Sequence, residues 1–387
     1  DATVERDAHA EVAAIFEHAW RLTQAKFYDA KLHGVDWPAV GAAHRKFLPH
    51  IRHWEDLAEL LSEMAGELNA SHQGSHFSGM KEGDSTGALG LYYDESHRGA
   101  GLRVAEVLAG GPADRPGSAL KVGALVLAVD GQAITPDRHL HGLLNNTAGR
   151  PVLVSVQPVD GGAPVDEVLR PVHWVAESNL AYERWVERRR ELAGRLSGGR
   201  IGYLHLSAMN LASYQRAYAD LFGMHRQAEA VIVDVRYNGG GNLHDPLVVM
   251  LTGRQYAGLV TRDGVPTADI PAGRWAKPSL VLGNASSYSD GSAFPALYQR
   301  EKIGPVVGDR IPGTGTAVVW EAQIERHLDY GVPQLGFLGK DGRWFENQEI
   351  VPDVLIAADP NAVAAGRDVQ IEAAVTRLLQ DLKSRKP

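Results

Sequence analysis

A serine-rich turn between an apolar run and a predicted helix is the first segment that could perform chemistry. The run Ser279–Leu282 leads into the turn Gly283–Ser289, and a helix is predicted from Asp290. A serine in such a turn would be exposed as a nucleophile, and the backbone N–H of Asp290 would face developing negative charge. The segment is not Gly-x-Ser-x-Gly, and serine and aspartate that merely cap the helix explain the local sequence equally well.

A glycine-rich loop is the second such segment. The apolar run Val231–Val235 is followed by Arg236-Tyr237-Asn238 and then by Gly239-Gly240-Gly241. Successive glycines can adopt positive φ and point their N–H groups at an anion, as in an oxyanion hole or a phosphate loop. The Gly-Lys-Ser/Thr ending of a nucleotide-binding loop is missing, so nucleotide binding is the weaker interpretation. A tight turn between a strand and a helix, without any ligand, stays open as an alternative.

A serine nucleophile needs a base, and local sequence does not identify one. The chain has 16 histidines. Three Ser-His pairs are present: Ser71-His72, Ser75-His76 and Ser96-His97. Histidines at 50, 53, 139 and 141 lack the spacing of a metal-ligand set, so we interpret them as surface residues and predict no metal site. Glu346 has the local sequence of an ordinary loop carboxylate.

Composition excludes several other classes of protein. The chain has 387 residues, a net charge of −8 and 44% hydrophobic residues, which indicates a multi-domain globular protein with a sizeable core. The acidic balance argues against nucleic-acid or anionic-membrane partners. The absence of cysteine excludes disulfides, a cysteine nucleophile and thiolate metal sites. No apolar run is long enough to span a membrane. The chain starts at Asp1 rather than Met, which suggests a processed product or an excised portion.

The first half of the chain changes from helical to β-rich patterning. Helices are predicted in Asp7–Gln24, from Trp37 and in Trp54–Leu68, followed by a polar loop over Asn69–Gly90. From about Gly87 to His173 the pattern indicates a small β module. Its strands are predicted at Ala88–Tyr93, Leu102–Leu108, Ala124–Val129 and Pro151–Pro158. One helix is predicted inside it, at Thr135–Leu144, with Pro136 in its first turn.

The second half alternates between strands and helices after a charged connector helix at Asn179–Leu196. Strands are predicted at Ile201–Leu206, Ala230–Val235, Ser279–Leu282 and Pro305–Gly308. Helices are predicted at Ser213–Met224, Leu243–Leu251, Asp290–Arg300 and Asp368–Leu382. This alternation indicates a largely parallel, buried sheet. Because ligands of such sheets bind at the carboxyl ends of the strands, the glycine loop and the serine turn are expected at one edge.

Five segments, taken in order along the chain, resemble one family. They are the Ile15–Trp37 region with Phe27-Tyr28-Asp29 and His33-Gly34-Val35-Asp36-Trp37, then Gly66–His72, Asp234–Gly241, Ser287–Gly291 and Glu346–Asp353. Together they are similar to the catalytic half of tricorn-type proteases, in the superfamily of C-terminal-processing, tail-specific serine proteases. The resemblance covers nearly the whole chain.

The resemblance implies a multi-domain α+β fold. A helical N-terminal domain is expected at 1–84, an inserted PDZ-like β module at 85–174, and an α/β catalytic domain with a crotonase- or ClpP-like core at 175–387. PDZ modules capture extended peptides by adding a strand to an exposed sheet edge.

The resemblance also assigns roles to individual residues. It makes Ser289 the nucleophile and His72 the general base, and it adds Ser71 and Glu346 to complete a catalytic tetrad. The resemblance selects Ser71-His72 over Ser75-His76, because Glu67-Leu68 precede Ser71 at the distance found in the family. The oxyanion hole is expected from the N–H of Asp290 and that of Gly240, with Gly239 the near alternative.

A serine endopeptidase acting on unstructured peptides, without metal or cofactor, is the function that the resemblance implies. A Ser-Lys dyad is rejected, because Lys302 lies in or just after the helix that Asp290 begins. The alternatives are a non-catalytic PDZ scaffold that binds peptides and a crotonase-like acyl-CoA enzyme. The resemblance further implies a homo-oligomer, and it slightly favours a periplasmic over a cytoplasmic location. The upstream β-propellers of the large family members are missing from this sequence, so the selection of substrate length stays open.

Overall fold

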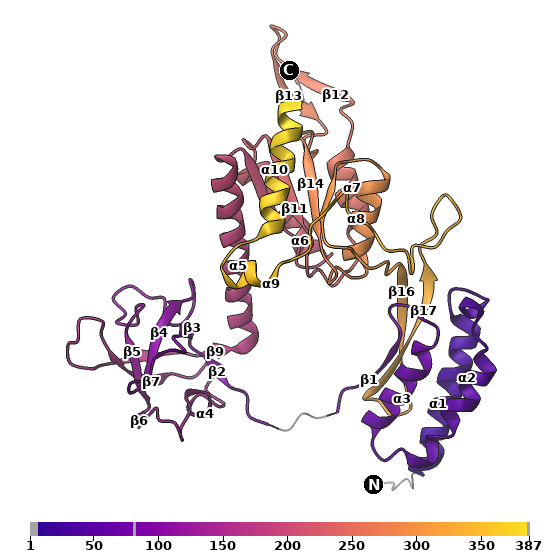
Figure 1. Cartoon of the computed structure of the whole chain (residues 1–387), viewed down its shortest axis with the longest axis horizontal. Helices are drawn as coiled ribbons and strands as arrows, with labels where there is room; N and C mark the ends of the chain where they lie inside the picture. Colours follow the sequence, from indigo (N-terminus) through magenta and orange to yellow (C-terminus); the bar gives the residue numbers. More distant parts are fainter. Residues whose placement is uncertain (1–6, 80–82, 385–387) are drawn as a thin grey trace. The chain divides into compact units, whose positions relative to one another are not determined.

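A computed structural model describes residues 7–79 and 83–384. The chain divides into two compact units, one made of residues 1–79 with 190–387 and the other of residues 80–189 (Figure 1). The first unit holds the helical N-terminal segment and the α/β segment, while the second holds the β module. The predicted fold class, with helical, inserted β and α/β parts, is confirmed.

The N-terminal segment contains three α-helices, and aspartate side chains cap the first two. They are α1 (Ala8–Lys26), α2 (Trp37–Arg45) and α3 (Trp54–Gly66). The Asp7 carboxylate accepts hydrogen bonds from the N–H groups at the start of α1, and the Asp36 carboxylate accepts one from Ala39 before α2. All three predicted helices are confirmed.

A three-stranded antiparallel sheet completes the core of these helices. Its strands run in the order β1 (Gly74–Phe77), β17 (Leu328–Gly336) and β16 (Thr316–Ala322). Leu328, Tyr330 and Val332 of β17 are buried among α1 and α3, and the Tyr330 hydroxyl lies 2.8 Å from the Thr23 hydroxyl. The predicted loop over Asn69–Gly90 is therefore wrong at 74–77. Its partner strand lies about 250 residues later in the chain, so β1 has no local signal.

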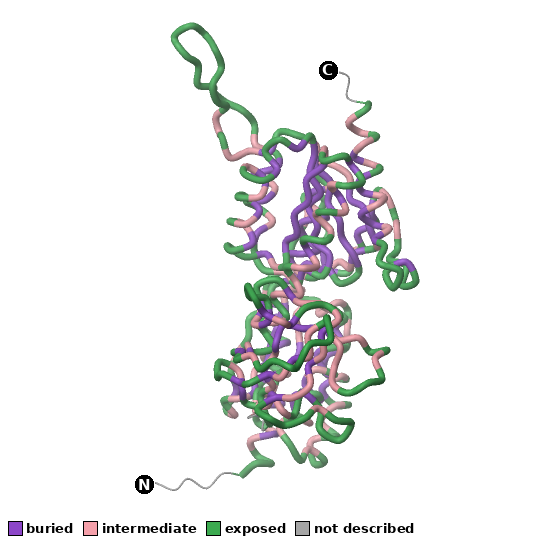
Figure 2. Tube along the Cα trace, turned by 90° about the vertical axis from the view of Figure 1, so that its left-hand side faces the viewer, coloured by how far each residue is buried: buried purple, intermediate pink, exposed green. Residues whose placement is uncertain are grey.

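A five-stranded parallel sheet forms the centre of the α/β segment. Its order is β10 (Ile201–His205), β11 (Ala230–Asp234), β14 (Ser279–Gly283), β15 (Val306–Gly308) and β18 (Val354–Leu355). The three strands β10, β11 and β14 are buried along their whole length (Figure 2). This burial on both faces explains their continuous apolar sequence, which predicted them correctly.

Helices cover both faces of this sheet. Val231 and Val233 share a core with residues of α6 (Leu211–Ala219), α7 (His244–Thr252) and α8 (Asp290–Arg300). The C-terminal helix α10 (Val369–Ser384) contacts β11, β14 and β15. A π-helical turn over Asp220–Met224 extends α6, where the sequence predicted one continuous helix.

The two chemically interesting loops leave the same edge of the sheet. Strands β11 and β14 are parallel neighbours in which Asp234 pairs with Leu282, so both end at the same level. The glycine loop runs from β11 to α7, and the serine turn runs from β14 to α8. The parallel topology thereby brings together two segments that are about 50 residues apart in sequence.

A buried ion cluster fixes the chain where β11 becomes the glycine loop. The Arg236 guanidinium donates hydrogen bonds to the carboxylates of Asp234 and Asp368 and to the Gln370 side chain. Asp234 also accepts a hydrogen bond of 2.8 Å from the Tyr203 hydroxyl. Both Asp234 and Arg236 are buried, so this cluster joins the sheet, the loop and the start of α10 without solvent.

The second unit is a small β structure. Its main sheet has the order β3 (Leu91–Tyr93), β4 (Leu102–Val107), β5 (Leu125–Val129), β7 (Val152–Gln157) and β8 (Val165–Leu169), with β6 (Gln132–Ala133) paired to β5. A two-stranded sheet of β2 (Gly87–Ala88) and β9 (Val172–His173) accompanies it, and α5 (Trp174–Ser197) follows.

One predicted helix of this unit is much shorter than expected. The sequence predicts a helix over Thr135–Leu144, but α4 spans only Leu140–Leu143. Residues Thr135 and Arg138 instead exchange two backbone hydrogen bonds in a turn, with Pro136 at its second position. None of the described helices in either unit is long and apolar enough to cross a membrane.

We predict that Arg236→Met lowers the free energy of unfolding by about 3–5 kcal/mol, because two buried carboxylates lose their countercharge. Urea unfolding followed by circular dichroism measures this change. Arg200→Met is the matched control, since Arg200 pairs with Glu229 at the surface and its removal should change little. Equal unfolding midpoints for the two variants would contradict this account of the cluster.

Candidate active site

Ser289 occupies a strained turn immediately before α8. Its φ is 55° and its ψ is −127°, and its side chain makes no capping hydrogen bond to the helix. The Ser289 N–H donates a hydrogen bond of 2.7 Å to the Thr314 hydroxyl. Positive φ in a non-glycine residue is unfavourable and is commonly retained at functional sites. Ser289 is the N-cap residue of α8 by position, but its side chain does not cap the helix.

The neighbouring Asp290 carboxylate caps a different helix from the one it begins. It accepts hydrogen bonds from the N–H groups of Leu243 at 2.5 Å and His244 at 3.0 Å, where α7 starts. It also pairs with the His244 imidazole, which raises the pKa of that histidine. As the first residue of α8, Asp290 has a backbone N–H without an acceptor inside its own helix.

The glycine loop lies directly against Ser289. A methyl group added to Gly240, whose φ is 102°, would lie only 2.8 Å from the Ser289 Oγ. The Gly240 N–H donates a hydrogen bond of 2.8 Å to the Asn238 side-chain oxygen. The Asn238 amide in turn donates to the Leu206 carbonyl at 2.7 Å. Within the described chain, the adjacent Gly239 N–H donates to no protein acceptor.

A chain of hydrogen bonds joins Glu346, Ser71 and His72. The Ser71 Oγ donates to the Glu346 carboxylate at 2.9 Å and lies 2.8 Å from Nδ1 of His72. The carboxylate also accepts the backbone N–H groups of Ser71 at 2.5 Å and Gly315 at 2.6 Å. The Ser71 hydroxyl donates its hydrogen bond to Glu346, so it can only accept one from His72. We therefore assign the His72 proton to Nδ1, which leaves Nε2 as an acceptor.

Two further side chains orient His72, and sequence reasoning missed both. The Thr316 hydroxyl lies 2.9 Å from Ser71 Oγ and 3.1 Å from His72 Nδ1. The Tyr288 hydroxyl accepts the His72 N–H at 2.8 Å, and the two rings lie 4.7 Å apart. Tyr288 directly precedes Ser289, so it links the serine turn to the histidine. A threonine at the start of an unpredicted strand carries no sequence signal for this role.

The structure brings these candidates together to different extents. Hydrogen bonds join Ser71 both to His72 and to Glu346, and Tyr288 places the Ser289 turn beside His72. Among the described side chains, no hydrogen bond joins the Ser289 hydroxyl to His72. His72 itself has a φ of 60°, so the backbone is strained at both His72 and Ser289.

The other Ser-His pairs have structural roles or lie elsewhere. Ser75 donates to the Asp329 carbonyl at 2.7 Å within the β1–β17 pair, and His76 stacks on Trp320. Ser96 and His97 belong to the second unit. The part of the chain that the structure describes holds no group of three histidine or acidic side chains arranged to bind a metal ion.

Burial lowers the pKa of His72 below its ordinary value of 6.5. Desolvation disfavours the charged imidazolium, so the ring is neutral at pH 7. A neutral imidazole with an unprotonated Nε2 is the form that can accept a proton from a hydroxyl group.

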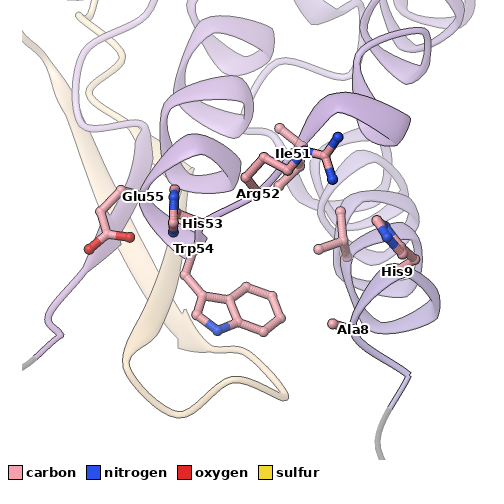
Figure 3. Close-up of a pocket in the computed structure, with 8 residues that line it drawn as sticks. Ala8, His9, Ile51, Arg52, His53, Trp54 and Glu55 are labelled. Atoms are coloured by element: carbon pink, nitrogen blue, oxygen red, sulfur yellow. The ribbon is translucent and has the colours of Figure 1, made fainter.

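The helical segment contains a cavity of about 400 Å³ that is separate from these residues. It is lined by Ala8, His9, Val12 and the segment Ile51–Glu55, around the first turns of α1 and α3 (Figure 3). It contains none of the predicted catalytic residues.

Comparison with known families agrees with this architecture. Residues 200–356 match the model of peptidase family S41, residues 8–66 that of the tricorn protease C1 domain, and residues 87–173 that of the tricorn protease PDZ domain. Together these three matches make the chain similar, part by part, to tricorn proteases and to peptidase family S41. The predicted relationship to tricorn-type proteases is thereby confirmed.

Individual relatives extend this similarity over the whole chain. The chain is 32% identical over 386 residues to tricorn protease homolog 1 of Streptomyces coelicolor. The aligned region covers 97% of this chain but only 36% of that relative. It therefore spans about a third of the length of this tricorn-type protein. The crystal structure of the tricorn protease matches with a TM-score of 0.83 at 22% identity, over 98% of this chain and 37% of that one. Mature CPAF matches with a TM-score of 0.53 at 15% identity, over 97% and 96% of the chains.

We predict that the His72 imidazole titrates below pH 6.5, which NMR of the ring carbons can measure. Because burial causes the shift, Tyr288→Ala should expose the ring and move the pKa back toward 6.5. Tyr288→Phe keeps the aromatic cover and should leave the pKa low. A pKa at or above 6.5 in the unaltered protein would show that burial does not control the charge of this ring.

Proposed function

We propose that this chain is a serine endopeptidase that hydrolyses peptide bonds of unstructured peptides through Ser289, His72, Ser71 and Glu346. The observation that carries the proposal is the hydrogen-bonded series from Glu346 through Ser71 to His72, next to the strained Ser289 turn. The match of residues 200–356 to the model of peptidase family S41 supports peptide hydrolysis as the reaction.

The first chemical step follows from the proton positions. The Ser289 Oγ attacks the carbonyl carbon of the scissile bond while His72 Nε2 takes the hydroxyl proton. The resulting imidazolium donates through Nδ1 to Ser71, whose hydroxyl donates to Glu346, so the carboxylate stabilises the charge through one intermediate hydroxyl. His72 then gives the proton to the leaving amine, and the acyl-enzyme is hydrolysed by water through the same steps in reverse.

The developing oxyanion needs two donors near Ser289. The Asp290 N–H at the start of α8 is the first, where the helix dipole adds to the hydrogen bond. Gly240 or Gly239 supplies the second. The Gly240 N–H already donates to Asn238, so we favour the Gly239 N–H, which has no acceptor within the described chain.

Two further features of the proposal come from the family resemblance. The substrates are unstructured peptides, as the resemblance to tricorn-type proteases implies. We also propose that several copies assemble, as in tricorn-type relatives. A non-catalytic peptide-binding scaffold is the competing function, and active-site labelling separates the two.

We expect a fluorophosphonate probe to label Ser289, as located by peptide mapping. Ser289→Ala should remove the label and lower peptide hydrolysis by at least about 10⁴-fold. Ser286→Ala is the matched control, because Ser286 is an exposed serine in the same turn, and it should keep both labelling and hydrolysis. A folded protein that is neither labelled nor active, alone or as an oligomer, would favour the scaffold.

We further expect kcat/KM to fall as the pH drops, with a midpoint below 6.5, because protonation of His72 removes the base. Glu346→Gln should lower kcat by about 10²–10⁴-fold, since the imidazolium loses its distant countercharge. Glu349→Gln changes an exposed carboxylate nearby and should leave the rate unchanged. If Glu346→Gln retained full activity across this pH range, Glu346 would have no part in the mechanism.

A further inference from the structure

The second unit contains a groove between an edge strand and a helix. Within the described residues, β3 pairs with β4 alone, so its other edge has no strand partner. A cavity of about 220 Å³ lies between β3 and α4, and its apolar lining comes from Leu89, Leu91, Leu140 and Leu144. An unpaired strand edge beside an apolar helix is the arrangement in which PDZ domains add a peptide as an extra strand.

A backbone donor between Leu89 and Leu91, two residues that line this groove, already has an anionic partner. Gly90, directly before β3, has a φ of 70°, and its N–H donates a hydrogen bond of 3.0 Å to the Glu177 carboxylate. Glu177 lies in the first turn of α5 and lines the same cavity. Backbone N–H groups in such turns are the usual holders of a peptide's terminal carboxylate. Here the protein's own carboxylate occupies that donor.

A second polar group of the groove has no partner. The Tyr93 hydroxyl is buried and forms no hydrogen bond with any described residue. Tyr93 lines this cavity and also the adjoining one of about 530 Å³, where it lies with Leu102 and His139. Burial and the nearby Glu177 charge raise the pKa of Tyr93, so its hydroxyl keeps its proton. A buried donor without an acceptor is unfavourable, and a carbonyl oxygen of a bound peptide would satisfy it.

We propose that this groove binds an internal, extended segment of a polypeptide as a strand added to β3, and that Glu177 excludes peptides that present a free C-terminal carboxylate. A terminal carboxylate at Gly90 would have to share one N–H with Glu177, and the two negative charges would repel each other. A neutral main-chain amide meets no such repulsion, and it supplies the carbonyl that Tyr93 lacks. This inference stands apart from the proposed catalytic residues, since it concerns which part of a polypeptide the second unit holds.

The test compares peptides that differ only in their C-terminal group. The full chain carries Ser289→Ala to prevent turnover. The probe is a fluorescein-labelled octapeptide mixture with random interior positions and leucine last, made either as the free acid or as the C-terminal amide. Fluorescence polarisation gives the two affinities. A benzophenone group in the same peptides then locates the bound site by photo-crosslinking and peptide mapping.

We expect the amide to bind at least about tenfold more tightly than the acid, with crosslinks in residues 86–144. Glu177→Ala frees the Gly90 N–H and removes the charge, so the acid should gain at least about tenfold while the amide changes by less than about threefold. Glu177→Gln keeps a hydrogen-bond acceptor without the charge and should give an intermediate result. Glu95→Gln, at an exposed glutamate of the same unit, should match the parent protein.

Three results would overturn the proposal. The first is an acid that binds as tightly as the amide while Glu177 is intact. The second is an acid affinity that does not rise in Glu177→Ala, which would leave Glu177 as a mere tie between α5 and the rest of the unit. The third is no binding of either form, or crosslinks confined to the segments around Ser289.

Discussion

The site depends on one buried carboxylate that joins two distant parts of the chain. Glu346 accepts two hydrogen bonds from Ser71 and one from Gly315. A buried carboxylate without such donors would be strongly destabilised, so the segments around residues 71, 315 and 346 must close together. The antiparallel sheet of β1, β17 and β16 makes this closure possible, because it places the segment after Leu68 beside the segment that leads to Glu346. The orientation of His72 follows from these contacts.

Backbone strain is concentrated around the same site, and each strained residue has a specific support. Ser289, His72 and Tyr237 all have positive φ. Their N–H groups donate to the Thr314 hydroxyl, the Tyr288 hydroxyl and the Asn284 side-chain oxygen, respectively. Conformations of this kind persist only where surrounding interactions enforce them. Here the enforcing interactions include these three hydrogen bonds and the buried Arg236 cluster, which holds the chain just before Tyr237.

The sequence predicted those parts of the molecule whose signals are local. Buried parallel strands such as Ala230–Asp234 read as continuous apolar runs, and α8 begins at Asp290 as expected. The strands β1, β16 and β17 escaped prediction, because each is short or mixed in character and pairs with distant residues. For the same reason, local sequence gave Glu346 no special role, and only the family resemblance pointed to it. Thr316 and Tyr288 could not have been found, since their roles exist only through contacts with His72.

The insertion of the second unit has a consequence for the order in which the molecule can be built during synthesis. The helices of residues 8–66 emerge from the ribosome before β17, which supplies part of their core and is made more than 250 residues later. At about 5–20 residues per second, Ser71 and His72 wait on the order of 20 s for Glu346. The nascent chain therefore holds an unassembled site while residues 73–345 are being made, and the β module at 80–189 can fold on its own contacts in the meantime. Such a delay keeps the candidate site from forming until residue 346 has been made.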